Sequence, residues 1–135
     1  MNFKLEKNFN NNVPSWEAIL NNFNWSFIAN KDIKHICPGF FVSHEAHLIK
    51  EVQTSLEKLD CKIAHLYFNI AIGKTFGKHK DDVDVYFWQV QGTTKWIIND
   101  KNIMLNPGDL LIVKKNVYHE VVPLTPRAGI SMSKI

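Results

Sequence analysis

The chain is organised around one segment, Gly77-Lys78-His79-Lys80-Asp81-Asp82-Val83-Asp84-Val85-Tyr86-Phe87-Trp88-Gln89-Val90-Gln91-Gly92. Its valine and aromatic residues predict a strand over 83–90. His79 and Asp81 stand just before this strand, two residues apart. Residues i and i+2 of an extended chain point to the same face, so the imidazole and the carboxylate can converge on one point.

A second histidine completes a candidate metal site. His119 follows His79 by forty residues and stands in Val117-Tyr118-His119-Glu120-Val121. Two imidazoles and one carboxylate form the facial triad that suits non-haem Fe(II), although Mn, Ni or Zn can also accept these ligand types. Asp82 is the alternative to Asp81, but its side chain would project to the other face. The expected metal ligands are His79, Asp81 and His119.

Length and composition restrict the class of protein. A chain of 135 residues with 45% hydrophobic and 21% charged residues fits a single globular domain. The net charge of +3 is spread out, without a basic stripe interleaved with aromatic residues, so nucleic acid is not an expected partner. No stretch approaches a membrane span, and the N-terminus lacks the apolar run of a signal peptide. With two cysteines and no CxxC spacing, reduced thiols and a cytoplasmic location are expected.

Arginine is rare in this chain. Of the sixteen basic residues, fifteen are lysine and only Arg127 is arginine. Arg127 was either retained by chance, or it occupies the one position where lysine cannot replace a planar, bidentate anion-binding group. The sequence leaves both interpretations open.

The first half of the chain is predicted to contain helices and short strands. Residues 1–14 are Asn-rich and expected to be a loosely ordered lead-in, and residues 15–60 a segment of helices and strands before a barrel over 61–135. Helices are predicted over 15–23 and 44–59, the second one capped by Ser43. Strands are predicted near 25–28 and 40–42.

The second half is predicted to be almost entirely strand. Residues 63–72 alternate, with His65, Tyr67 and Asn69 on a polar face that either lines a ligand pocket or meets solvent. Further strands are predicted over 94–98, 103–105, 110–113, 118–122 and 130–133, and Asp109 is expected to hold the Pro107-Gly108 turn. This pattern favours a mainly β fold, an antiparallel double-sheet jelly roll.

Two blocks of the sequence resemble one family. His79-Lys-Asp81-Asp-Val-Asp84 with Gln89, Gly92 and Lys95-Trp96, followed by Leu105-x-Pro107-Gly108-Asp109 and Tyr118-His119-Glu120, resembles the JmjC-like cupins. These are Fe(II)- and 2-oxoglutarate-dependent oxygenases that include ribosomal-protein hydroxylases. The resemblance implies a double-stranded β-helix, a cupin barrel, that holds Fe(II) through His79, Asp81 and His119 and takes 2-oxoglutarate as co-substrate.

The expected 2-oxoglutarate anchor departs from the family pattern. Relatives typically carry Lys or Arg fifteen residues after the first histidine, and this position is Thr94. Lys95 is next to it, but a one-residue offset on a strand points it to the opposite face. Other related oxygenases place Arg ten residues past the distal histidine and Ser two further on. Here Arg127 stands at plus eight and Ser131 at plus twelve.

The resemblance also suggests further residues around the ligands. The candidate cofactor-binding residues are Arg127, Thr94, Tyr67, Asn69, Gln89 and Ser131, with Lys74 as a fallback anchor. The residues close enough in sequence to orient the metal ligands are Asp84, Gln89 and Glu120. Gln89 and Thr94 are expected to point inward, and Trp88 and Trp96 to be core or interface aromatics.

Three functions fit these residues. The first is a small Fe(II) hydroxylase that uses 2-oxoglutarate. The second is a metal cupin without 2-oxoglutarate, acting as a dioxygenase or isomerase on a small acid. The third is a non-enzymatic barrel that binds a small ligand. The short chain favours a small-molecule substrate, or a single protein side chain, over a long peptide, and a homodimer is expected.

Overall fold

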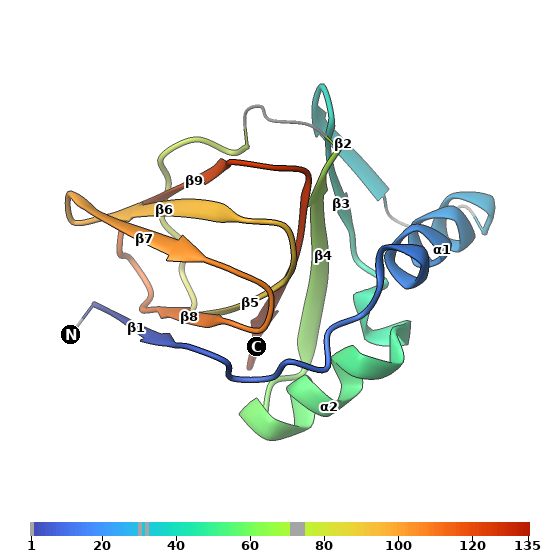
Figure 1. Cartoon of the computed structure of the whole chain (residues 1–135), viewed down its shortest axis with the longest axis horizontal. Coiled ribbons are helices and arrows are strands. Elements are labelled where there is room, and N and C mark those ends of the chain that lie inside the picture. The colour runs from blue at the N-terminus through green and yellow to red at the C-terminus, as the bar shows by residue number, and fades with distance from the viewer. Residues whose placement is uncertain (1, 30, 32, 71–74) are drawn as a thin grey trace.

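The protein is built from two antiparallel sheets (Figure 1). The computed structural model describes residues 2–29, 31, 33–70 and 75–135. One sheet has the strand order β1-β8-β5-β10-β4-β3-β2 and the other the order β7-β6-β9. The strands are β1 (Phe3–Glu6), β2 (Ile33–Cys37), β3 (Phe40–Ser43), β4 (Ile63–Asn69), β5 (Val85–Gln91), β6 (Thr94–Ile98), β7 (Lys101–Leu105), β8 (Leu110–Val113), β9 (His119–Pro123) and β10 (Arg127–Ser133). The prediction of a mainly β double-stranded β-helix is confirmed.

Two hydrophobic cores lie on the two faces of the larger sheet. Inside the barrel, β5 and β8 pack against the smaller sheet through Val85, Phe87, Trp96, Ile98, Ile103, Leu105, Leu111 and Val113. On the outer face, α1 (Trp16–Ile28) and α2 (Lys50–Leu59) cover Leu66, Phe68, Trp88, Val90, Ile130 and Met132 (Figure 1). Along β4, β5 and β10, side chains therefore alternate between the outer core and the interior of the barrel. The inward side chains can line a site.

The strand predicted near 25–28 is wrong, because α1 continues to Ile28. The amide of Ala29 donates to the carbonyl of Trp25, and the hydroxyl of Ser26 donates to the carbonyl of Asn22. Trp25 and Ile28 favour a strand by intrinsic propensity, but both side chains remain exposed and gain no packing that would favour a strand. Helix packing through the other face decides the conformation.

The single helix predicted over 44–59 is broken in two. A 3-10 turn, η1 (Ala46–Leu48), comes first, and α2 begins only at Lys50, because Ile49 between them is extended at φ −79° and ψ 125°. Ser43 is the last residue of β3 rather than a helix cap, and its hydroxyl accepts from the amide of Glu45. The break buries Ile49 and exposes Leu48.

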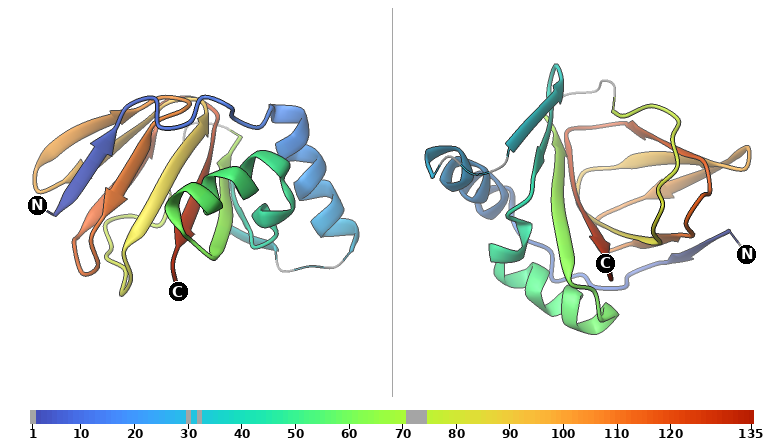
Figure 2. Two further views of the ribbon diagram at one scale, coloured as in Figure 1. Left: turned by 90° about the horizontal axis from the view of Figure 1, so that it is seen from below. Right: turned by 180° about the vertical axis from the view of Figure 1, so that it is seen from behind.

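The N-terminal segment is docked, which corrects the expectation of a loose lead-in. β1 pairs with β8 from Phe3↔Val113 to Glu6↔Leu110. Farther on, Asn10 accepts a hydrogen bond from the indole of Trp88 at 3.0 Å and donates to the hydroxyl of Ser55 at 3.0 Å. Figure 2 shows the segment running from β1 along the strand ends to α1. Asn10, the buried asparagine of this segment, therefore bonds to protein groups instead of solvent.

Among the described residues, no helix combines the length and the apolarity needed to cross a membrane.

Candidate metal centre

A short antiparallel bridge brings the two histidines together. The amide of His79 donates to the carbonyl of His119 at 2.9 Å, and the amide of His119 donates to the carbonyl of His79 at 2.8 Å. The carbonyl of Asp81 accepts from the amide of Asn116 at 2.7 Å. These main-chain hydrogen bonds join the His79–Asp81 segment to β9 and to the turn before it. The backbone therefore fixes the positions of the three side chains.

The three ligand atoms converge. Nε2 of His119 lies 3.3 Å from Oδ2 of Asp81, Nε2 of His79 lies 3.8 Å from the same oxygen, and all three atoms fall within 4.8 Å of one another. Two neighbouring ligands about 2.1 Å from an octahedral ion stand about 3 Å apart. The donor set therefore fits a divalent metal with only small side-chain adjustments.

Both imidazoles are oriented in the same way. Nδ1 of His79 lies 2.9 Å from the carbonyl of Gly77, and Nδ1 of His119 lies 3.0 Å from the carbonyl of Val117. A carbonyl beside Nδ1 favours a proton there, which leaves the Nε2 lone pair directed at the site. Each histidine thus carries its own orienting partner two residues upstream.

Asp81 is held as a carboxylate. Its pKa lies below the usual value chiefly because of the hydrogen bond with His119; burial opposes this, and the charges of the two imidazoles add to it. His119 is buried, while His79 and Asp81 are about one-third exposed. An anionic carboxylate at neutral pH is the form that ligates a metal.

A cavity of about 30 Å³ adjoins the three ligands, close to the share of one water molecule in the liquid. Its remaining lining residues are Phe40, Tyr67, Thr75, Phe76, Val85, Phe87, Trp96, Val121, Arg127 and Ser131. The walls are thus mostly aromatic and aliphatic, with few polar groups among them. Apolar walls with a few convergent polar groups are typical of small-ligand sites.

Arg127 is the one arginine, and it lines this cavity. Its side chain is 1% exposed, its Nε donates to Oδ1 of Asn69 at 2.7 Å, and its guanidinium lies over the rings of Phe40 and Phe87 at 5.4 and 6.0 Å. Burial lowers the pKa of Arg127 to about 9, while Tyr67 has the opposite effect, so the group is charged at neutral pH. Its Nη1 has no hydrogen-bond acceptor among the described residues.

Comparisons with known proteins agree with this geometry. A family model described as the JmjC domain matches residues 39–103. The Escherichia coli ribosomal oxygenase YcfD, in complex with cobalt and 2-oxoglutarate, superposes with a TM-score of 0.73 at 16% identity, over 96% of this chain and 47% of that chain. No curated protein sequence matches. The chain therefore has a cupin fold, with a JmjC-like segment over residues 39–103.

Two shorter structures share the fold of this protein along most of their length. A cupin superfamily protein from Desulfitobacterium hafniense gives a TM-score of 0.58 at 17% identity, covering 94% of each chain. KdgF from Halomonas sp. gives 0.58 at 20% identity, covering 79% of this chain and 91% of that chain. The present chain spans about half the length of YcfD, so the likeness covers only that part of the enzyme.

The structure brings several predicted cofactor-binding residues to the cavity. Arg127, Tyr67 and Ser131 line it, and Asn69 supports it through Arg127. Burial raises the pKa of the Tyr67 phenol, and a hydrogen bond with Ser131 has the opposite effect. The polar face of β4 therefore lines a pocket at Tyr67 rather than meeting solvent.

Like Asn69, the predicted residues Gln89 and Thr94 do not line the cavity. Gln89 and Thr94 point inward and are fully buried, as expected, but they bind each other: the Thr94 hydroxyl donates to Oε1 of Gln89 at 3.1 Å. Nε2 of Gln89 donates to the carbonyls of Gln91 and Gly92, both at 3.0 Å. This pair supports the turn at Gly92.

The other expected residues lie apart from the metal ligands or outside the described residues. Asp84 accepts from the amide of Lys115 and pairs with the Lys114 ammonium. Glu120 faces a separate surface hollow beside Tyr118. Lys74, the fallback anchor, lies outside the described residues.

Sequence reasoning missed the aromatic wall. Trp96 belongs to the inner core, as expected, but it also lines the cavity, with its ring 5.5 Å from that of His119 at an interplanar angle of 25°. Phe87 meets Trp96 edge-on at 4.8 Å. The sequence signal was the alternation of side chains along a strand. Phe87 lies two residues from Gln89, and Trp96 two residues from Thr94, so both aromatic residues share the inward face expected for Gln89 and Thr94.

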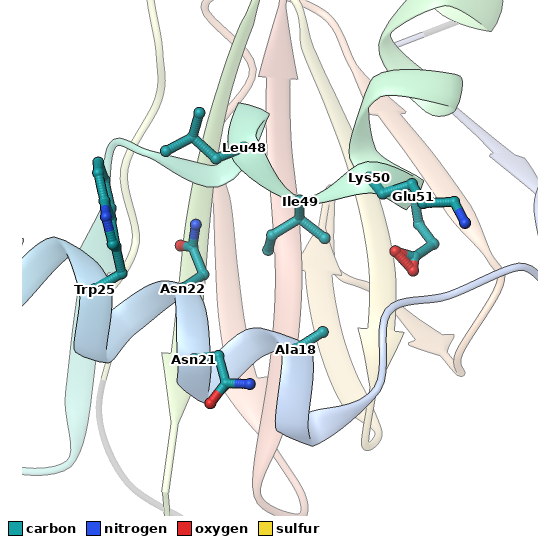
Figure 3. A pocket seen from close by; sticks show the side chains of 8 residues that line it. All are labelled: Ala18, Asn21, Asn22, Trp25, Leu48, Ile49, Lys50 and Glu51. Carbon is teal, nitrogen blue, oxygen red and sulfur yellow. The ribbon is translucent and has the colours of Figure 1, made fainter.

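A larger hollow of about 450 Å³ lies outside the barrel, between α1 and the break before α2 (Figure 3). Ala18, Asn21, Asn22, Trp25, Leu48, Ile49, Lys50 and Glu51 line it. Its charged residues are Lys50 and Glu51, so it lacks the set of two histidines and one carboxylate that adjoins the smaller cavity.

Proposed function

We propose that this protein is a JmjC-like non-haem Fe(II) oxygenase that uses 2-oxoglutarate and hydroxylates a small molecule or a single side chain presented by a partner. One observation carries the proposal: the buried guanidinium of Arg127, with an unpaired Nη1, lines the same cavity as His79, Asp81 and His119. A buried, unpaired charge is unfavourable unless a ligand of opposite charge completes it.

Charge supports a dicarboxylate in particular. A divalent metal, Arg127 and the Asp81 carboxylate together leave two positive charges in a cavity with apolar walls. A 2-oxo dicarboxylate neutralises both, with one end at the metal and the other at the guanidinium. Arg127 would then do from β10 what the basic residue at the position of Thr94 does in relatives.

The residues have distinct tasks in this reaction. Bound Fe(II) and 2-oxoglutarate supply the activation of O₂ when they are present. His79, Asp81 and His119 hold the metal on one face, and the carbonyls of Gly77 and Val117 keep the imidazoles oriented. Arg127 holds the distal carboxylate, and the aromatic wall excludes water.

The cavity must enlarge to admit a five-carbon acid, because its volume is about that of one water molecule. Phe76 is the side chain best placed to move. It is 44% exposed and packs edge-on against Phe40, Tyr67 and His79 at ring distances of 5.1 to 5.6 Å. Rotation of Phe76 toward solvent would open the cavity without disturbing the sheets.

An anaerobic titration tests the proposal. Metal-free protein is titrated with Fe(II) and then with 2-oxoglutarate, and the weak visible charge-transfer band of the chelate is recorded. The band is expected in the wild type, absent in His79→Ala because the metal is lost, and absent in Arg127→Ala because the acid is lost. Fe(II) binding by Arg127→Ala, measured separately, shows that this variant still folds.

A metal cupin without 2-oxoglutarate is the second candidate, favoured by Thr94 at the usual basic position and by the whole-length match to the short cupins. Iron binding without the band would overturn the 2-oxoglutarate proposal in favour of this candidate. Absence of metal binding would leave a barrel that binds a small ligand as the remaining function.

A further inference from the structure

We infer that Trp96 is a ligand-binding residue, whose indole N–H donates a hydrogen bond to an oxygen at the metal end of the bound acid. The inference rests on the proposed function and extends it. The indole is 2% exposed and lines the cavity, and its Nε1 has no acceptor among the described residues. A buried donor without an acceptor destabilises the fold, and a phenylalanine at this position would avoid that cost.

The indole is fixed in place. Trp96 pairs with Val121 on β9 and Ile103 on β7, so its backbone is held from both sides. Its ring lies nearly parallel to that of His119 and edge-on to Phe87. A side chain held this firmly cannot turn its N–H toward another acceptor at low cost.

Position determines which end of the acid it meets. The ring lies beside His119, whose Nε2 is one of the three ligand atoms, whereas Arg127 is bound to Asn69 on the opposing sheet. The cavity thus has two unpaired buried donors, one from each sheet. An acid spanning the barrel satisfies both, with its distal carboxylate at Arg127 and a metal-side oxygen at Trp96.

Trp88 provides a matched control. It is fully buried like Trp96, but its indole N–H already donates to the carbonyl of Asn10 at 3.0 Å. It faces the outer core under the helices and does not line the cavity. One chain therefore carries a satisfied and an unsatisfied buried indole.

The test uses zinc-loaded protein with ¹⁵N-labelled indoles, titrated with 2-oxoglutarate and followed by NMR. The Trp96 indole proton is expected to move downfield and to exchange more slowly with water, while that of Trp88 stays in place. In calorimetry, Trp96→Phe should weaken 2-oxoglutarate binding about 5- to 10-fold, the loss of one hydrogen bond, with zinc affinity nearly unchanged. Trp88→Phe should leave 2-oxoglutarate affinity unchanged and lower the unfolding temperature.

The two possible failures are distinguishable. If the wild type binds 2-oxoglutarate while the Trp96 resonance stays in place, the inference is wrong and the proposed function stands. If the zinc protein does not bind 2-oxoglutarate, both are overturned. The resonance is read in the wild type, so the inference can be judged even if Trp96→Phe folds poorly.

Discussion

Two groups of buried polar side chains inside the barrel differ in how they are satisfied. Gln89 and Thr94 use their hydrogen-bonding groups on each other and on the carbonyls around Gly92. Arg127 and Trp96 are equally buried, yet each keeps one donor without an acceptor among the described residues. The first group is satisfied within the fold, and the second group keeps donors that a ligand in the cavity would satisfy.

The difference separates structural from functional polar residues. A satisfied buried group contributes to stability, and its removal costs mainly the desolvation of the partner left behind. An unsatisfied buried donor lowers stability, and proteins retain such groups where they bind. The two groups should therefore respond to mutation in opposite ways, in stability for Thr94 and in ligand affinity for Arg127.

The largest effect is expected at the metal. Asp81→Ala removes the only carboxylate among the three described ligand atoms and should reduce Fe(II) affinity more than about 100-fold, beyond the loss typical of an outer-shell partner. Asp81 is about one-third exposed, so the unfolding temperature should change little. The matched control is Asp82→Ala, whose exposed neighbouring carboxylate should leave affinity unchanged. Equal effects of the two substitutions in a metal titration would refute the assignment of Asp81.

Arg127→Met should come next. It removes the buried charge proposed to bind the distal carboxylate, so 2-oxoglutarate affinity should fall roughly 100-fold, about 3 kcal/mol. Stability of the metal-free protein should change little, because removal of an unpaired buried charge offsets the loss of the hydrogen bond from Nε of Arg127 to Asn69. Calorimetry and thermal unfolding measure the two effects. A strong loss of stability with little loss of affinity would place Arg127 in the structural group.

Thr94→Val should show the reverse. It leaves Oε1 of Gln89 buried without its donor, so the free energy of unfolding should fall by about 1–2 kcal/mol. Affinity for 2-oxoglutarate should change less than about twofold, although this position carries the anchor in relatives. The control is Thr93→Val, whose hydroxyl bonds Asn106 nearer the surface and should matter less. A large loss of affinity in Thr94→Val would mean that Thr94 takes part in binding.

Local patterns predicted that the side chains of His79 and Asp81 converge. His79 and Asp81 lie two residues apart in an extended segment, a geometry that depends on the chain alone. The polar face of β4 was also predicted, because polar and apolar residues alternate in this part of the sequence and Tyr67 lies on the polar face. Both predictions needed only the direction of side chains along a strand.

Features that depend on tertiary partners were not visible in the sequence. The N-terminal residues look like a loose tail, and only β8 and Trp88 show that they dock. The aromatic residues after Phe23 favour a strand by propensity, yet in the structure they form the last part of α1. Whether Gln89 or Arg127 has a free donor depends on three-dimensional neighbours, so the distinction between the two groups came from the structure.

The smallest expected effect concerns Asp109. Like Gln89 and Thr94, it is a buried polar residue whose side chain is hydrogen-bonded within the fold. Its carboxylate accepts from the Lys7 ammonium and from the amides of Asn8 and Asn106. Burial tends to raise the pKa of Asp109, but these hydrogen bonds outweigh it and the net pKa lies below the ordinary value. Its stabilising contribution is therefore fully present above the unfolded-state pKa of about 4 and is lost as pH falls through the lower folded-state pKa.

Urea unfolding at pH 7, 5 and 3 should thus show a smaller acid-induced loss of stability in Asp109→Asn than in the wild type, because the variant has no carboxylate to protonate. At pH 7 the variant should be the less stable protein, since the ammonium of Lys7 and two main-chain amides lose a charged acceptor. Metal and 2-oxoglutarate affinities at pH 7 should match the wild type, because Asp109 does not line the cavity. If the two pH profiles were parallel, the carboxylate would not be what holds the N-terminal segment against the barrel, and main-chain pairing of β1 with β8 would be the main attachment.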